Sequence, residues 1–344
     1  MAELELQRLY RKYKEVDSFE GNAQSFRILT VLAVRSRELP GLNLTRATLN
    51  AVLKYPYGRD PKDPKKSVKW GAYKSEEGFR RWARQREPDD RKCVEAEVMD
   101  WADDIAYAVH DAEDFYSAGL IPLDELRTHP RKRSRTPEGA TELEKFVTAV
   151  FDRWRREKRT VTYDDRRAMQ LLNEIFAVMP IVEPYSGSRD QRAAMGVWTS
   201  HLIGTYVRAI RLAPKGVSPG VPRVVIPRQS RFEVDLLKQL TWHYVILNPA
   251  LAAQQYGQRR IISDLFEIFL EAADARPTAA VRRVLPTAFE EALADSEAKG
   301  RVPRGTRIRI AADAVAGLTE QQALDMHRRL TGYDSRSVLD PIVR

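Results

Sequence analysis

The fold is decided by an acidic, alanine-rich run: Asp100-Trp101-Ala102-Asp103-Asp104-Ile105-Ala106-Tyr107-Ala108-Val109-His110-Asp111. No proline or glycine interrupts the chain from about residue 91 to residue 117, and apolar residues recur around most of a helical circumference, which predicts a buried helix. At roughly 100° per residue, Asp103, Tyr107 and Asp111 share one stripe, and Asp100 lies one turn earlier. Stacked carboxylates in a buried setting stay ionised only beside a cation or strong donors. The pattern therefore predicts a helix that presents its acids to a metal ion.

The composition indicates a chain that can fill a complete core. Its 344 residues are 43% hydrophobic, and helical periodicity dominates, without the strand and helix alternation or the glycine-rich phosphate loop of α/β folds. Proline, glycine and valine gather at residues 217–227. We therefore expect an all-α bundle, with amphipathic helices at roughly residues 141–158, 163–178 and 188–212 and one small β excursion near residues 217–227.

Charge and hydropathy limit the class of partner. Lys and Arg exceed Asp and Glu by 57 to 48, which favours anionic partners such as a nucleoside triphosphate or a nucleic acid. No apolar run of about 18 residues and no signal peptide occurs, so we expect a cytoplasmic protein without a membrane partner. The basic run 131–135 lacks aromatic residues, and we favour a solvated loop over a contact with single-stranded nucleic acid. The single cysteine, Cys93, is expected to be a packed thiol.

A second informative string, Phe-Glu-Gly-Asn-Ala-Gln-Ser-Phe-Arg, runs from Phe19 to Arg27. Read from the residues alone, Gly21 and Asn22 begin a helix, and Gln24 and Arg27 stand on its first turns, where donors meet either a ligand or solvent. Five further strings of sequence are informative in combination with it, and they lie at Gly41–Thr45, Leu53–Pro56, Lys69–Glu76, Tyr256–Phe266 and Ala311–Leu324.

Together these strings resemble the dGTPase family, the HD-domain deoxynucleoside triphosphate triphosphohydrolases, from Phe19 to about Gly332. The acidic run is similar to the family's helix that carries the fourth metal ligand, and the Phe19 string matches its Phe-Glu-Gly-Asn-Ala-Gln-Ser-x-Arg signature. The resemblance implies a hydrolase of nucleotide metabolism with an HD/phosphohydrolase-type helical bundle and a divalent metal, Mg²⁺ or Mn²⁺. Its reaction would cleave a dNTP, with dGTP as the expected substrate, into deoxynucleoside and triphosphate. Residues 1–130 would be the C-terminal part of the HD-type core, and residues 131–344 the helical C-terminal region.

The resemblance also assigns roles to single residues. Asp103 would ligate the metal, while Tyr107 and Asp111 would face the deoxyribose. The other substrate-binding residues that it implies are Asn22, Lys54, Tyr55, Lys69 and Lys74. The residues alone leave other roles open, because Lys54 can complement the C-terminus of a helix at 46–54, and Lys69 and Lys74 can be solvated lysines.

The metal site is expected to be incomplete. The family uses one His, a His-Asp pair and a distant Asp, and only the last has a match, at Asp103. The five histidines all follow the Phe19 string, whereas the family's histidine ligands and its Gly-His-x-Gly-Glu segment precede it; they are His110, His129, His201, His243 and His327. The His110-Asp111 dipeptide therefore has the sequence of the pair but not its position, and we do not expect it to bind the metal. We expect His201, His243 and His327 to pack in the core or to cap helices.

We accordingly expect no catalytic residue in this chain and leave alternative functions open. One is a dGTPase-like enzyme completed by an upstream segment or an HD-containing partner. Another is a non-catalytic nucleotide- or nucleic-acid-binding regulatory module or partner subunit. The third is a truncated remnant whose exposed apolar face would favour a homo-oligomer.

Overall fold

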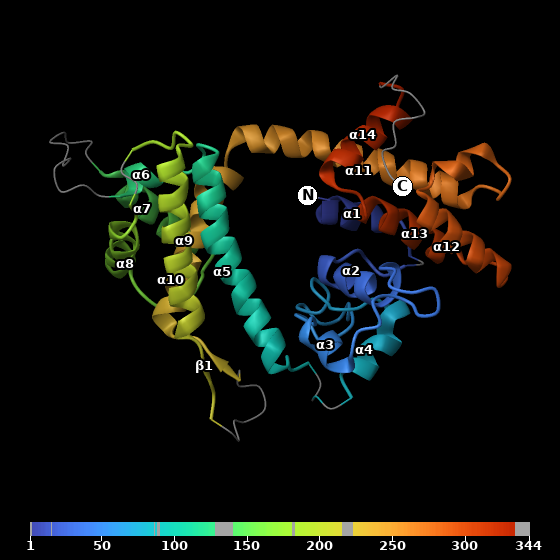
Figure 1. Ribbon diagram of the computed structural model, residues 1–344, viewed down its shortest axis with the longest axis horizontal. Helices are drawn as coiled ribbons and strands as arrows, with labels where there is room; N and C mark the ends of the chain where they lie inside the picture. The colour runs from blue at the N-terminus through green and yellow to red at the C-terminus, as the bar shows by residue number, and fades with distance from the viewer. Residues whose placement is uncertain are drawn as a thin grey trace. The chain divides into compact units, whose positions relative to one another are not determined.

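The protein is all-α, as predicted (Figure 1). The computed structural model describes residues 2–14, 16–85, 87, 90–127, 140–180, 183–214 and 223–333. The chain divides into two compact units, Met1–Arg91 with Ala253–Arg344 and Lys92–Ala252. The predicted boundary near residue 130 separates two regions that the family resemblance implies, not two compact units of the chain. It therefore stays a prediction. No helix in the described parts of the chain is long and apolar enough to cross a membrane.

The first unit contains helices from both ends of the sequence. Its elements are α1 (Ala2–Tyr10), α2 (Gly21–Arg27), the π-helix η1 (Ile28–Leu32), α3 (Arg46–Ala51), the 3-10 helix η2 (Lys74–Glu76), α4 (Glu77–Ala83), most of α11 (Pro249–Asp274), the 3-10 helix η4 (Ala280–Val284), α12 (Thr287–Ala298), α13 (Arg304–Ala316) and α14 (Glu320–Leu330). One apolar core joins the two ends, since Leu9 of α1 clusters with Phe266 of α11 and Ile308 of α13. A smaller core beneath α2 and α3 includes Phe26 and Leu49.

The second unit is a helical bundle around α5. Its elements are α5 (Val94–Ser117), α6 (Leu123–Leu126), α7 (Glu142–Arg156), α8 (Asp165–Ala177), α9 (Arg189–Ala209), β1 (Arg211–Leu212), β2 (Val224–Val225), α10 (Arg228–Leu240) and the π-helix η3 (Thr241–Ile246). The long helix α5 packs against α9 and α10. Side-chain oxygens of Thr141, Asp164 and Ser188 cap α7, α8 and α9, which explains why the helices begin where the sequence predicts them.

Two predicted helix ends are wrong. Helix α9 stops at Ala209 instead of continuing to Leu212, because β1 pairs antiparallel with β2 and sets Arg211 opposite Val225. Strand β1 of the small sheet thus precedes the predicted β segment, residues 217–227. Residues 217–222 of that segment lie outside the described part of the chain. Helix α3 stops at Ala51, so Lys54 and Tyr55 lie in the bend beyond it rather than at its C-terminus.

Candidate functional site

The helix α5 is amphipathic rather than buried on most sides. Its buried face is formed by Ala96, Trp101, Ile105, Ala108, Val109, Ala112 and Tyr116. Ala102 and Ala106 are exposed, Asp103 and Asp111 are half-buried, and the Tyr107 side chain is 57% exposed. Alanines extend the apolar pattern in the sequence but cost little to expose, so the prediction of a helix buried around most of its circumference is wrong.

Two of the acids on α5 are matched by lysines. The Lys92 ammonium lies 2.5 Å from the Asp100 carboxylate, and the Lys238 ammonium of α10 lies 2.8 Å from that of Asp104. Asp111 is different, because burial and the neighbouring charge of Asp114 raise the pKa of its carboxyl group. A half-buried carboxyl group with a raised pKa is a feature of binding and catalytic sites.

Tyr107 and Asp111 line a cavity of about 390 Å³ in the second unit. The other lining residues come from the C-terminus of α7 and the segment after it, from α10 and from η3, and they are Arg153, Glu157, Arg159, Lys238, Gln239, Thr241, Trp242 and Ile246. Lys238 and Arg159 share Asp235 as an ion-pair partner. Asp103 lies on the same helix but does not line this cavity.

Arg153 is the most constrained cation of this cavity. Its guanidinium lies 4.7 Å from the centroid of the Trp242 ring, and it donates a hydrogen bond to Gln239. Burial lowers the pKa of this guanidinium, and the positive charges of Arg159 and Arg156 lower it further. An anion in the cavity would stabilise the charged guanidinium and so oppose both effects.

The described residues do not build a metal site by themselves, since none of their His, Cys, Asp and Glu side chains form a group of three or more that could hold an ion. His243 packs against the rings of Phe146 and Tyr244, as predicted. His327 instead contacts the Asp264 carboxylate at 3.0 Å. His129 lies outside the described residues. A single carboxylate does not fit a divalent cation, so Asp103 as a ligand stays a prediction.

In the first unit, Asn22 and Lys69 meet on Glu20. The Asn22 amide and the Lys69 ammonium each donate to one Glu20 carboxylate oxygen at 2.9 Å, and Lys69 also donates to Glu3 at 2.8 Å. Burial alone would lower the pKa of the Lys69 ammonium, but these two hydrogen bonds raise it above its ordinary value. Glu20 is fully buried and also caps α2 through the Ala23 amide. The structure thus brings two of the predicted substrate-binding residues together.

The remaining predicted residues of this unit lie on neighbouring segments. The Gly71 amide donates to the Tyr57 carbonyl at 2.9 Å, and a Cβ on Gly71 would lie 2.0 Å from the Tyr55 carbonyl oxygen. This close approach sets Tyr55 beside the segment that begins at Lys69. The Lys74 side chain is 91% exposed, 3.9 Å from Asp17, which is the geometry of a solvated lysine that can still reach a ligand.

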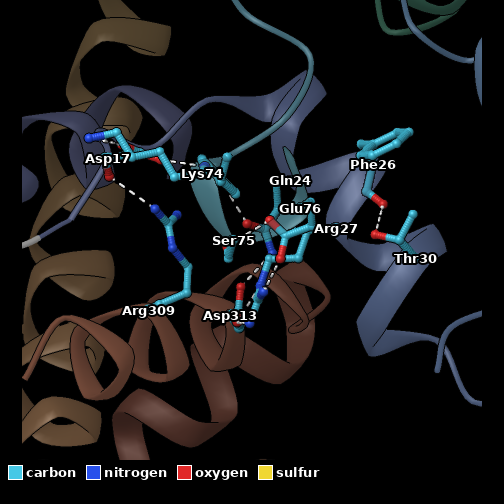
Figure 2. A network of polar contacts seen from close by, with 11 residues as sticks. Asp17, Gln24, Phe26, Arg27, Thr30, Lys74, Ser75, Glu76, Arg309 and Asp313 are labelled. Carbon is cyan, nitrogen blue, oxygen red and sulfur yellow. Dashed lines mark hydrogen bonds and ion pairs between the residues drawn. The ribbon is translucent and has the colours of Figure 1, made fainter. Parts of the chain in front are cut away.

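Gln24 and Arg27 form hydrogen bonds and ion pairs with other residues of the protein (Figure 2). The sequence predicts a ligand or solvent as their partner, and the structure instead pairs both side chains with buried carboxylates. The Gln24 amide donates to Asp313 at 2.8 Å. The Arg27 guanidinium lies 2.8 Å from Asp313 and 2.5 Å from Glu76, and both carboxylates are almost fully buried. The two strings at Phe19–Arg27 and Ala311–Leu324 therefore meet in one polar network. Asp313 lies in an apolar run of the sequence, and a carboxylate buried at such a position requires a hydrogen-bond or ion-pair partner. This pattern is the sequence signal that could have indicated the network.

These features define a class of protein: an all-α fold with an acidic helix beside a cation-lined cavity. A family model described as a phosphohydrolase-associated domain matches residues 224–329. A deoxyguanosinetriphosphate triphosphohydrolase-like protein of Streptomyces coelicolor is 34% identical, over 93% of this chain and 71% of the relative. Proteins of the same name from Bifidobacterium longum and Corynebacterium diphtheriae are 29% and 31% identical, over 91% and 74% of this chain.

The chain belongs to the family of deoxyguanosinetriphosphate triphosphohydrolase-like proteins. It spans 71%, 63% and 59% of the lengths of these three relatives. The resemblance predicted from the sequence strings is thereby confirmed, and so is the HD-type all-α fold.

Proposed function

We propose that this chain is the deoxynucleotide-binding part of a triphosphohydrolase that converts a dNTP and water into a deoxynucleoside and inorganic triphosphate, with dGTP as the substrate. The observation that carries the proposal is the cavity beside α5. Tyr107 and Asp111 line it together with the cations of Arg153, Arg159 and Lys238. Membership of the family supports the same reaction.

Each side chain of the cavity has a task that its chemistry suits. The Asp111 carboxylate can accept a hydrogen bond from a sugar hydroxyl, and the exposed Tyr107 ring can pack against a deoxyribose, where a 2′-hydroxyl would lose its water. The cations can pair with phosphate oxygens. Asn22, Lys54, Tyr55, Lys69 and Lys74 are proposed as further substrate contacts. Among them, Lys74 is the most exposed lysine, whereas Lys69 already pairs with two carboxylates.

A divalent metal, Mg²⁺ or Mn²⁺, belongs to the proposed reaction, with Asp103 as one ligand. The described residues do not supply the others, so we assign to them the binding and orientation of the substrate and no step of bond cleavage. Histidines of an HD-containing segment or partner subunit would complete the site. A homo-oligomer is the other assembly that we propose.

A second candidate is a non-catalytic nucleotide- or nucleic-acid-binding regulatory module or partner subunit. The observation that favours it is the lack of a group of metal-binding side chains among the described residues. The basic run 131–135, which would serve a nucleic acid, lies outside them.

The release of deoxyguanosine and inorganic triphosphate from dGTP, with Mn²⁺ or Mg²⁺, separates these candidates. The variant to compare is Asp103→Ala, and Glu95→Ala at an exposed position of the same helix is its control. Turnover that only Asp103→Ala abolishes supports the enzyme. No turnover by the chain alone, followed by turnover when an HD-containing partner is added, supports a completed enzyme. No turnover in either case contradicts the hydrolase and leaves the binding module.

A further inference from the structure

A second and larger hollow, of about 630 Å³, lies at the C-terminus of α7. Its walls are Ala149, Val150, Asp152, Arg153, Arg155, Arg156, Trp242, His243 and Leu247. It shares Arg153 and Trp242 with the cavity beside α5, but Tyr107 and Asp111 do not line it. Its size is within the range of small-molecule sites, which is roughly 300 to 1,000 Å³.

The positive charge of this hollow exceeds what α7 requires. Arg153, Arg155 and Arg156 face one carboxylate in its walls, that of Asp152, and Arg153 also lies 3.5 Å from the Glu157 carboxylate, which lines the cavity beside α5. A helix C-terminus carries about half a negative charge, so one cation in the last turn would complement it. The Arg155 guanidinium pairs with Asp152 at 2.7 Å. Arg156 is exposed and lies within salt-bridge distance of no carboxylate in the described residues. The hollow therefore has positive charge left for a ligand.

The hollow also holds one of its guanidiniums in place. The Trp242 indole lies against the Arg153 guanidinium at 4.7 Å, and η3 positions this indole with an irregular π-helical turn. Turns of this kind recur at functional sites. Because the guanidinium covers one face of the indole, the hollow is better suited to phosphate oxygens than to base stacking. Burial lowers the pKa of the His243 imidazole, which opposes a positive charge on this ring.

We propose that this hollow binds a linear oligophosphate anion, with Arg155 and Arg156 as its principal ligands and Arg153 as a fixed third cation. Several guanidiniums around one hollow match a chain of phosphates better than a single phosphate, since each guanidinium can pair with a different group through two parallel hydrogen bonds. The site does not depend on the proposed hydrolase activity. Free inorganic triphosphate and the triphosphate of a nucleotide share this chemistry.

The test is calorimetric binding of sodium tripolyphosphate, pyrophosphate and orthophosphate to the full chain at fixed pH and ionic strength. The variant is Arg155→Gln with Arg156→Gln. The control is Arg166→Gln with Arg192→Gln, which removes two exposed arginines of the same unit that line neither cavity. We expect tripolyphosphate to bind most tightly, and the variant to lose at least about tenfold in affinity while the control stays within about twofold.

Equal affinity for the three anions, or equal losses in the variant and the control, would overturn the proposal, because either result indicates unspecific charge attraction. Repeating the titration with dGTP tells the two sources apart. A loss for dGTP in Arg155→Gln with Arg156→Gln supports a nucleotide triphosphate as the ligand, and a loss confined to tripolyphosphate supports the free anion. If Arg159→Gln with Lys238→Gln, which removes two cations that line only the cavity beside α5, abolishes tripolyphosphate binding as strongly as the arginine variant does, the anion occupies that cavity, and the separate site is refuted.

Discussion

At the residue scale, the polar interior of the first unit depends on Asp313. Its carboxylate accepts from Gln24 and Arg27, which lie almost 290 positions away in the chain. The side chain is fully buried. A buried charge of this kind is tolerated only because its partners are in place, and the loss of either partner leaves the other uncompensated.

The first prediction concerns this carboxylate. Asp313→Asn should lower the free energy of unfolding by about 3 kcal/mol, since it leaves the Arg27 guanidinium with Glu76 alone. Urea unfolding followed by circular dichroism measures the effect. Asp295→Asn, at an exposed position of α12, should change stability by less than about 0.5 kcal/mol. Equal effects of the two variants would show that the network does not stabilise the fold.

The second prediction concerns Asp111, whose replacement should raise the free energy of unfolding at pH 7 rather than lower it. Its raised pKa means that the folded protein holds the proton more tightly than the unfolded chain does. Its favourable contribution is therefore fully present below the ordinary pKa of aspartate, about 3.9, and is lost as the pH rises through the folded value. Asp111→Asn should then stabilise the protein at pH 7 relative to the unchanged chain, and this gain should vanish near pH 3.

The measurement is the urea midpoint of both proteins at each pH. Asp104→Asn is the matched comparison, because it removes a partner of Lys238 and should not stabilise. A destabilised Asp111→Asn protein at pH 7 would mean that the carboxylate is a structural ion rather than a group kept for a ligand.

At the element scale, the close approach of two segments at Gly71 shapes the first unit. Gly71→Ala should destabilise by about 2 kcal/mol, because the new Cβ would lie 2.0 Å from the Tyr55 carbonyl oxygen, and backbone has to move. Gly78→Ala is the control: its Cβ meets nothing within 4 Å in α4, and it should be neutral or stabilising by up to about 1 kcal/mol. Thermal unfolding of both variants decides, and an unaffected Gly71→Ala protein would refute the close approach.

The sequence predicts the helices well and the contacts between them poorly. Caps such as Thr141 and Ser188 are local, so the helix starts could be placed in advance. The early end of α9 depends on a strand partner more than ten residues later, and no local pattern reveals it. The acidic helix shows the same limit. Its stripe of Asp103, Tyr107 and Asp111 could be derived from spacing, whereas the arginines beside it come from α7 and the segment after it, and their position depends on packing between helices.

At the scale of the whole molecule, the family assignment and the proposed activity have different foundations. Identity over most of the chain establishes the family. The activity also requires a metal site, and the described residues contain no group that could form one. The net charge of +9 suits the anionic ligands proposed for both cavities. Deoxynucleotide recognition by Tyr107 and Asp111 is the claim on which the proposed function depends.

Calorimetric titration of dGTP and GTP into the full chain tests that claim most directly, with the variants Tyr107→Ala and Asp111→Asn and the control Glu95→Gln at an exposed position of α5. The account predicts that dGTP binds more tightly than GTP. It also predicts that each variant weakens dGTP binding by about tenfold, while the control binds as the unchanged chain does. Unchanged dGTP binding in both variants, or equal affinity for GTP and dGTP, would contradict it.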